Sequence, residues 1–211
     1  MILETGRVIA VDDDVAWVET VRRSSCGACS GQDSCGPNLL DRFLAGRRTH
    51  VRVRLVGDEV AVVAVNSARP NPQPWRSSGR IPPSQLEALP GVLADERVRH
   101  RFVFLVTHYA PRLRSGLPDT WRHGLVNADA LLDACRDVSP GVLLFGHVHW
   151  RYTVRVDGVK PRLFCAGSAT KKDVEGLWVF DVEAGHARAT PGRWEGDRYV
   201  LEPGEAIDTA E

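Results

Sequence analysis

The chain has 211 residues, with 27 basic and 27 acidic side chains, so its formal net charge is zero. A neutral chain has no global field that would attract nucleic acid or an anionic membrane, and no apolar run in it is long enough to span a bilayer. It begins without the basic-then-apolar order of a secretory signal, and its five cysteines fit reduced thiols better than a disulfide framework; we therefore expect a cytoplasmic location, no nucleic-acid partner and no membrane span.

The first predicted element is a strand–turn–strand pattern. Ile2 to Val11 and Val15 to Val21 are rich in β-branched residues, and three aspartates separate them. A glycine-rich loop follows, in which Cys26, Cys29 and Cys35 have the spacing C-x2-C-x5-C. Thiolates at this spacing can bind one metal ion, form a redox dithiol or hold an iron–sulfur cluster. We weigh a zinc, iron–sulfur or redox site at these cysteines equally against free thiols in a loop.

This segment resembles a known family. Glu4 to Val8, the strand that ends at Glu19, the cysteine loop and Arg48 to Val51 are similar to the cytoplasmic N-terminal region of the RseC/MucC regulators of the sigma-E envelope response. The resemblance covers about the first 50 residues. It implies a small β-rich segment over residues 1–50, which precedes a second unit over residues 51–202 and a tail over residues 203–211.

A hairpin and a proline-rich loop open the second unit. Val51 to Leu55 and Val60 to Val65 are typical of two strands joined by a Gly-Asp turn. From Ser67 to Pro83, prolines exclude regular structure. Asn66 and Arg69 are candidates for substrate contacts, although a packed connector is the commoner role of such a loop.

Two helix–strand pairs follow along the chain. Ser84 to Leu93 is a predicted helix, in which Ser84 and Glu87 form a capping box. It leads into an apolar run from Phe102 to Val106, which is typical of a buried strand. A second predicted helix, Ala130 to Cys135, leads into another buried strand that begins at Val142.

Both buried strands end in histidine. His108 follows the first strand; the second ends at Gly146, after which His147 and His149 stand one residue apart. Gly146 lets the backbone turn and approach a ligand closely, because it has no Cβ. Imidazole is a common ligand of zinc, iron and manganese, and strand ends are where α/β folds build their sites. We predict that His108, His147 and His149 bind a divalent metal, whereas His123 is either a proton donor or a surface histidine.

These histidines carry a second resemblance. Gly146-His147-Val148-His149 and Thr107-His108 are similar to the last two metal motifs of the calcineurin-like metallophosphoesterases. The likeness extends over residues 51–181 through Asn66 to Pro72, Gly79 to Ile81 and Ala166 to Thr170. In this family such histidines help to hold two divalent ions, which activate water and clamp the attacking and leaving oxygens. The resemblance implies an α/β fold, a layered β-sandwich with flanking helices, that hydrolyses small phosphomonoesters or phosphodiesters with Mn, Fe or Zn.

The departures from the family pattern lead to alternatives. The upstream Asp-x-His, Gly-Asp and Gly-Asn-His motifs are missing, so we expect an impaired enzyme with one ion in place of two. The alternatives are a regulatory or redox module built on the cysteines and a non-functional fusion of two gene pieces. A partial α/β domain leaves sheet edges unpaired and apolar faces uncovered, which favours oligomers. Beyond His149 we expect only strands, and then a frayed tail from Gly204 to Glu211.

Overall fold

The computed structural model describes residues 6–12, 15–20, 51–71, 73, 75–169, 171, 174 and 176–210. Strand β1 (Gly6–Asp12) pairs antiparallel with β2 (Val15–Thr20), as the strand–turn–strand pattern predicts. The predicted cysteine site at Cys26, Cys29 and Cys35 lies outside the described residues.

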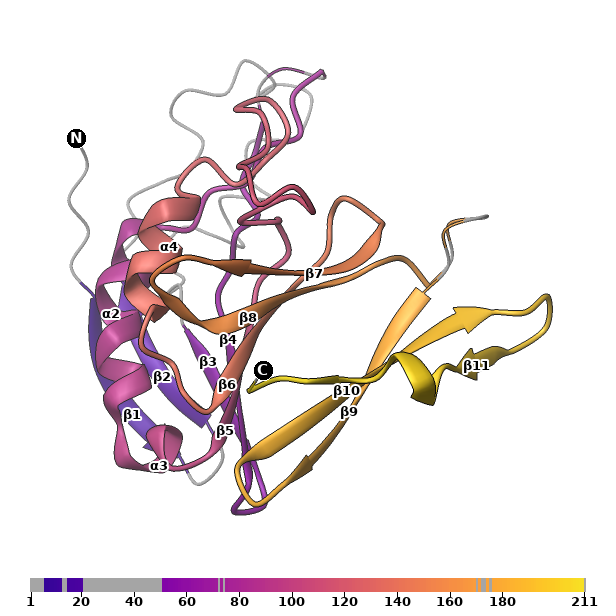
Figure 1. The fold of residues 1–211 in the computed structure, drawn as a ribbon. Helices are drawn as coiled ribbons and strands as arrows, with labels where there is room; N and C mark the ends of the chain where they lie inside the picture. Colours follow the sequence, from indigo (N-terminus) through magenta and orange to yellow (C-terminus); the bar gives the residue numbers. More distant parts are fainter. Residues whose placement is uncertain are drawn as a thin grey trace.

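A six-stranded sheet is the centre of the described part of the chain, in the order β3-β4-β5-β6-β8-β7 (Figure 1). The hairpin β3 (Arg52–Val56) and β4 (Val60–Ala64) forms one edge. Strands β4, β5 (Phe102–Val106), β6 (Gly141–Phe145) and β8 (Val159–Ala166) run parallel. At the other edge β7 (Arg151–Val156) pairs antiparallel with β8.

The apolar runs form central strands because both faces of this sheet are buried. Successive side chains of a strand point to opposite faces. On β5, Val103 and Leu105 therefore join the core under the helices, whereas Phe102 and Phe104 join a second core on the opposite face. A parallel strand with two covered faces needs apolar side chains at nearly every position, and this requirement explains the continuous runs in the sequence.

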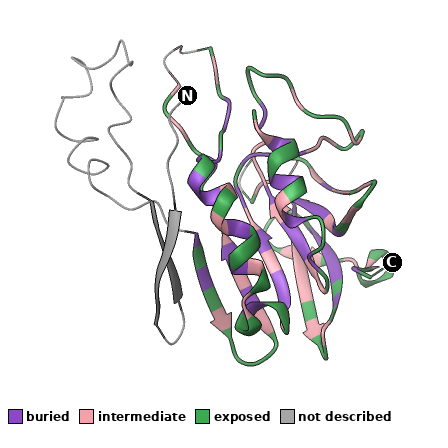
Figure 2. Ribbon diagram, turned by 90° about the vertical axis from the view of Figure 1, so that its left-hand side faces the viewer, coloured by how far each residue is buried: buried purple, intermediate pink, exposed green. Residues whose placement is uncertain are grey.

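Three helices cover one face of the central sheet: α2 (Pro83–Ala94), α3 (Glu96–Arg99) and α4 (Ala128–Cys135). Buried Leu89 of α2 and Leu131 of α4 pack into the same core as the sheet, and Figure 2 shows the purple buried stretches between these helices and the strands. The predicted capping box of α2 is wrong. The N-cap is Pro82, and the buried Ser84 hydroxyl lies inside the first turn with no hydrogen-bond partner among the described residues.

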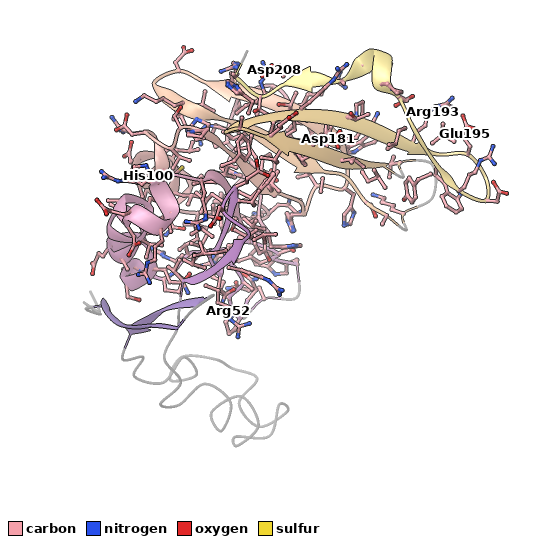
Figure 3. The ribbon with its side chains drawn as sticks, turned by 90° about the horizontal axis from the view of Figure 1, so that it is seen from below. Arg52, His100, Asp181, Arg193, Glu195 and Asp208 are labelled. Atoms are coloured by element: carbon pink, nitrogen blue, oxygen red, sulfur yellow. The ribbon has the colours of Figure 1, made fainter. Side chains whose placement is uncertain are left out.

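A second sheet covers the opposite face. It contains β9 (Gly176–Glu183), β10 (His186–Trp194), β11 (Tyr199–Leu201) and β12 (Ile207–Asp208). Phe164 of β8 lies between Trp178 and Phe180 of β9, with ring centroids 5.2 Å from each. Figure 3 shows Asp181 of β9 and Arg52 of β3 on opposite sides of the molecule. In the described part of the chain both faces of the central sheet are covered, so the prediction of uncovered apolar faces is wrong.

The end of the chain is not frayed as predicted. After the 3-10 turn η1 (Pro203–Glu205), β12 pairs with β10, and the backbone N–H and the hydroxyl of buried Thr209 both donate to the carbonyl of Ala187 at 3.0 Å. The sequence misses this return because the segment is short and has no apolar run. Within the described residues, no helix is long and apolar enough to cross a membrane.

Candidate active site

The carboxyl ends of β5 and β6 meet at one edge of the central sheet. The two strands are parallel neighbours, so the loops that follow them start side by side. The backbone N–H of Thr107 donates to Leu144 O at 3.0 Å, and that of Gly146 donates to His108 O at 3.0 Å. These bonds continue the ladder past the strands and hold the two histidine-bearing loops together.

A buried serine anchors the first of these loops. The Ser67 hydroxyl accepts hydrogen bonds from the backbone N–H groups of His108 and Tyr109, each at 3.2 Å. Ser67 is 1% exposed, so its hydroxyl is shielded from competing water. Sequence reasoning did not single out Ser67, because a lone serine after a strand gives no signal of this role.

Two of the three predicted ligands meet directly. The His108 Nε2 and His147 Nδ1 atoms lie 3.3 Å apart, and the two rings are at an angle of 76°. The ring of Tyr109 lies 4.2 Å from that of His147. The remaining nitrogen of His147, Nε2, is buried and has no hydrogen-bond partner among the described residues.

The backbone at the second histidine loop is strained. His147 and His149 have positive φ angles of 71° and 63°. Residues with a Cβ rarely adopt this left-handed conformation, and such strain is concentrated at functional sites. The prediction that Gly146 provides the turn is wrong, because the left-handed positions fall on the histidines and a Cβ at Gly146 would have only an ordinary contact, 3.9 Å from His108 O.

A third histidine joins the cluster from the long loop between β5 and α4. The His123 ring lies 4.2 Å from the His147 ring, and its Nδ1 atom lies 2.6 Å from Asp119 Oδ2. Asp119 is absent from the sequence-based candidates; its i, i+4 spacing from His123 was the only signal. Two roles are predicted for His123, a proton donor and a surface histidine. The structure places its ring beside the candidate ligand His147, which is the position that the first role requires.

The surroundings keep His147 neutral. Burial, together with the neighbouring His123 and His108, lowers the pKa of His147 from 6.5 to about 4, and the His123 backbone and the Asp119 carboxylate act in the opposite direction. Neutral imidazole is the form that binds metal ions. At neutral pH, a metal ion therefore would not have to displace a proton from this ring.

The donor set fits one divalent ion better than two. Two ring nitrogens that bind one tetrahedral ion at about 2.0–2.1 Å lie about 3.3–3.4 Å apart, and His108 Nε2 and His147 Nδ1 have this separation. Among the described residues, however, no three His, Cys, Asp or Glu side chains are grouped closely enough to form a complete site. The pair can supply two ligands, and the other positions would be open to water or substrate.

The remaining predicted residues are placed as follows. His149 is exposed and does not take part in the ring contacts that join His108, His123 and His147. Asn66 is exposed, and its Oδ1 accepts from the Ala68 N–H at 3.0 Å. The Arg69 guanidinium donates to Ser78 O at 3.1 Å and to Ser78 Oγ at 2.6 Å. Asn66 and Arg69 thus organise the proline-rich loop.

Comparison with known proteins gives two likenesses. The model of the family "Positive regulator of sigma(E), RseC/MucC" matches residues 8–68, which confirms the predicted resemblance and extends it across β3 and β4. No curated protein matches the chain.

Among solved structures, a dimetal phosphatase from Danio rerio is 16% identical with a TM-score of 0.38; the match covers 62% of this chain and 38% of that protein. A Vps29 double mutant from Entamoeba histolytica is 17% identical with a TM-score of 0.30, and wild-type Vps29 from the same organism, complexed with Zn²⁺, is 13% identical with a TM-score of 0.31. Each Vps29 match covers 70% of this chain and 98% of the other.

Proposed function

We propose that this chain is a metal-dependent hydrolase of small phosphomonoesters or phosphodiesters, weakened because its described residues offer ligands for a single ion. The observation that carries the proposal is the 3.3 Å separation of His108 Nε2 and His147 Nδ1 at the carboxyl edge of a parallel sheet. Ligand sites of open α/β sheets are built at this edge. The sequence motif and the geometry therefore favour the same pair of residues.

Each side chain has a task in this proposal. A bound divalent ion would act as a Lewis acid toward a phosphoryl oxygen. His108 and His147 would hold it with neutral imidazole nitrogens, and the buried Ser67 hydroxyl keeps the His108 backbone in place. The Asp119 carboxylate lies at hydrogen-bond distance from Nδ1 of His123 and orients that ring, which would donate a proton to the leaving oxygen. We propose His149 as a further ligand from the sequence motif alone.

The family match supports a second candidate function. Residues 8–68 match a regulator of sigma(E), and Cys26, Cys29 and Cys35 lie in this range. A regulatory or redox module at these cysteines, with zinc or an iron–sulfur cluster, remains our alternative proposal. In either case we propose a cytoplasmic protein with the units 1–50 and 51–202. The family match runs to residue 68, so the hairpin of β3 and β4 belongs to both resemblances.

Hydrolysis of bis-p-nitrophenyl phosphate tests the first function. The protein is stripped with EDTA, dialysed and assayed with and without Mn²⁺. We expect Mn²⁺-dependent activity in the unaltered chain and its loss in His147→Ala. The matched control is His186→Ala, because His186 is an exposed histidine on β10, in the second sheet. Activity that persists in His147→Ala, or that is absent from the unaltered chain, would reject the proposed enzyme.

A further inference from the structure

Two tryptophan–arginine pairs from distant loops are brought together beside the candidate active site. Trp75-Arg76 belongs to the loop between β4 and α2, and Trp121-Arg122 belongs to the loop between β5 and α4. The backbone N–H of Ser77 donates to Arg122 O at 2.9 Å. Two further bonds, Gly79 N–H to Gly124 O at 3.1 Å and Val126 N–H to Gly79 O at 3.0 Å, close the two loops together like a short ladder.

The two indoles form an exposed aromatic surface. Their ring centroids are 6.3 Å apart and the rings are nearly perpendicular, at 88°. Trp75 is 58% exposed and Trp121 is 56% exposed. Large aromatic surfaces left in water next to each other indicate a binding site rather than a packing role. We call Trp75, Trp121, Arg76 and Arg122 the Trp–Arg platform.

Guanidinium groups line this surface. The Arg76 carbon Cζ lies 5.2 Å from the Trp121 ring, and Cζ of Arg122 lies 5.1 Å from both indoles. Cation–π contacts at such distances hold the arginines over the rings. A planar ligand stacked on a free face of one of these indoles would therefore lie next to positive charge.

The positive charge continues into the neighbouring loop. Arg69 Nη2 and Arg76 Nε donate to the same atom, the buried Ser78 Oγ, at 2.6 and 2.9 Å. Burial and the charges of Arg76 and Arg80 lower the pKa of Arg69. None of Arg69, Arg76 and Arg80 forms an ion pair with a carboxylate of the described residues. Clustered guanidiniums without a carboxylate are suited to a phosphate, which they bind with directed N–H groups.

We propose that the Trp–Arg platform and Arg69 bind a nucleoside monophosphate, with the base stacked on one of the two perpendicular indoles and the phosphate held by the guanidiniums. A nucleoside monophosphate combines a planar aromatic group with a compact anion, the two features that this surface offers side by side. Sugar phosphates lack the first and nucleosides lack the second. The prediction of no nucleic-acid partner is based on net charge and so does not consider two separate Trp-Arg dipeptides that only the fold brings together.

The Trp–Arg platform lies next to the histidine cluster of the candidate active site. His123 directly follows Arg122, and its ring lies 4.2 Å from His147. A nucleotide on the platform would therefore lie beside the candidate active site. The binding inference does not rest on the proposed hydrolysis, because it concerns residues other than the histidines and is measured as binding with EDTA present.

Isothermal titration calorimetry of the full chain in EDTA tests the proposal. We expect adenosine 5′-monophosphate to bind at least about tenfold tighter than ribose 5-phosphate, which lacks the stacked base, and at least about tenfold tighter than adenosine, which lacks the phosphate. Trp121→Ala and Arg76→Ala should each weaken binding about tenfold or more. The control is Trp194→Ala, because Trp194 packs on Tyr199 in the second sheet.

The outcomes separate cleanly. Equal binding of adenosine 5′-monophosphate and ribose 5-phosphate, or unchanged affinity in a folded Trp121→Ala, would overturn the proposal. The ligand comparison uses the unaltered chain, so it decides the matter even where a variant does not fold. A 5′-phosphorylated single-stranded decanucleotide identifies the source of the ligand: tighter binding than the mononucleotide assigns the platform to a strand end, and equal binding assigns it to a free nucleotide.

Discussion

The Nε2 atom of His108 lies 3.3 Å from the Nδ1 atom of His147, although 39 positions separate the two residues in the chain. The parallel pairing of β5 with β6 produces this approach, because it aligns the ends of the two strands. The Ser67 hydroxyl fixes the backbone on the His108 side. The pair is thus built into the sheet edge and does not depend on a ligand to bring its members together.

The lowered pKa of His147 predicts a pH-dependent stability of the metal-free protein. The pKa falls from 6.5 to about 4, with burial as the first cause. Between these values the unfolded chain binds a proton at this residue and the folded chain does not. The free energy of unfolding should therefore decrease as the pH falls from about 6.5 to about 4, with no further loss from this group below pH 4.

Urea denaturation of EDTA-treated protein at a series of pH values measures this effect. The comparison is with His147→Gln, which cannot titrate. The difference in free energy of unfolding between the two proteins should change within this pH window and stay level above it. A difference that does not vary with pH would show that His147 is protonated in the folded chain as easily as in the unfolded one.

His149→Gly separates backbone strain from ligand chemistry. His149 has a φ of 63° and an exposed side chain. Glycine adopts the left-handed conformation without strain, which stabilises the folded protein, but it also increases the entropy of the unfolded chain. The net effect should be a gain in stability of the metal-free protein of about 0.5–1 kcal/mol. Thermal denaturation in EDTA checks this gain. A loss of stability would mean that the imidazole makes a contact worth more than the strain, and a parallel Mn²⁺-dependent assay shows whether the ring also serves as a ligand.

Gly79→Ala and Gly91→Ala form a matched pair with opposite expected signs. A Cβ at Gly79 would lie 2.2 Å from Tyr109 Cδ2 and 2.7 Å from Ser67 O, whereas at Gly91 of α2 it would meet nothing within 4 Å. The first change should destabilise the protein by about 1–3 kcal/mol through overpacking. The second should stabilise it by about 1 kcal/mol, because alanine favours the helix. Chemical denaturation of both variants measures the change in the free energy of unfolding. A destabilised Gly91→Ala or an unaffected Gly79→Ala would contradict this packing.

The buried thiols should be unreactive. Burial raises the pKa of Cys135 to about 12 and that of Cys165 to about 11, so neither forms a thiolate at pH 8. In a variant with Cys26, Cys29 and Cys35 replaced by serine, a thiol reagent should find no reactive group in the native state and two after unfolding. A thiol of this variant that reacts at once under native conditions would mean that one of the two sites opens readily.

Much of the sheet could be predicted from the sequence, because strand formation there depends on local patterns. The runs at Phe102–Val106 and Gly141–Phe145 are strands as expected, since each supplies apolar residues to two covered faces. The errors arise where tertiary contacts decide. The return of β12 onto β10 depends on pairing with a distant strand, and the start of α2 at Pro83 places Ser84 two positions after the N-cap, Pro82, where it cannot cap the helix.

The proximity of two candidate residues could be predicted for the same reason. His108 and His147 lie together because strand ends are recognisable and parallel strands share an edge, and their role as metal ligands stays a prediction. Asp119 could not be found, since it reaches the cluster through a long loop whose course depends on bonds to a second loop, such as that from Gly79 N–H to Gly124 O. His149 shares the motif of His147 but not its ring contacts, because the left-handed backbone breaks the alternation that an extended chain would give.

The most direct test of the account is the number of Mn²⁺ ions that the chain binds, measured from the loss of the free-ion signal in electron paramagnetic resonance. Mn²⁺ suits imidazole and oxygen ligands and avoids thiolates, so the cysteines do not enter the count. We predict one ion per chain in the unaltered protein and in His186→Ala, and none in His147→Ala. Two ions per chain would contradict the single-ion site, and one ion retained by His147→Ala would show that the His108–His147 pair is not the metal centre.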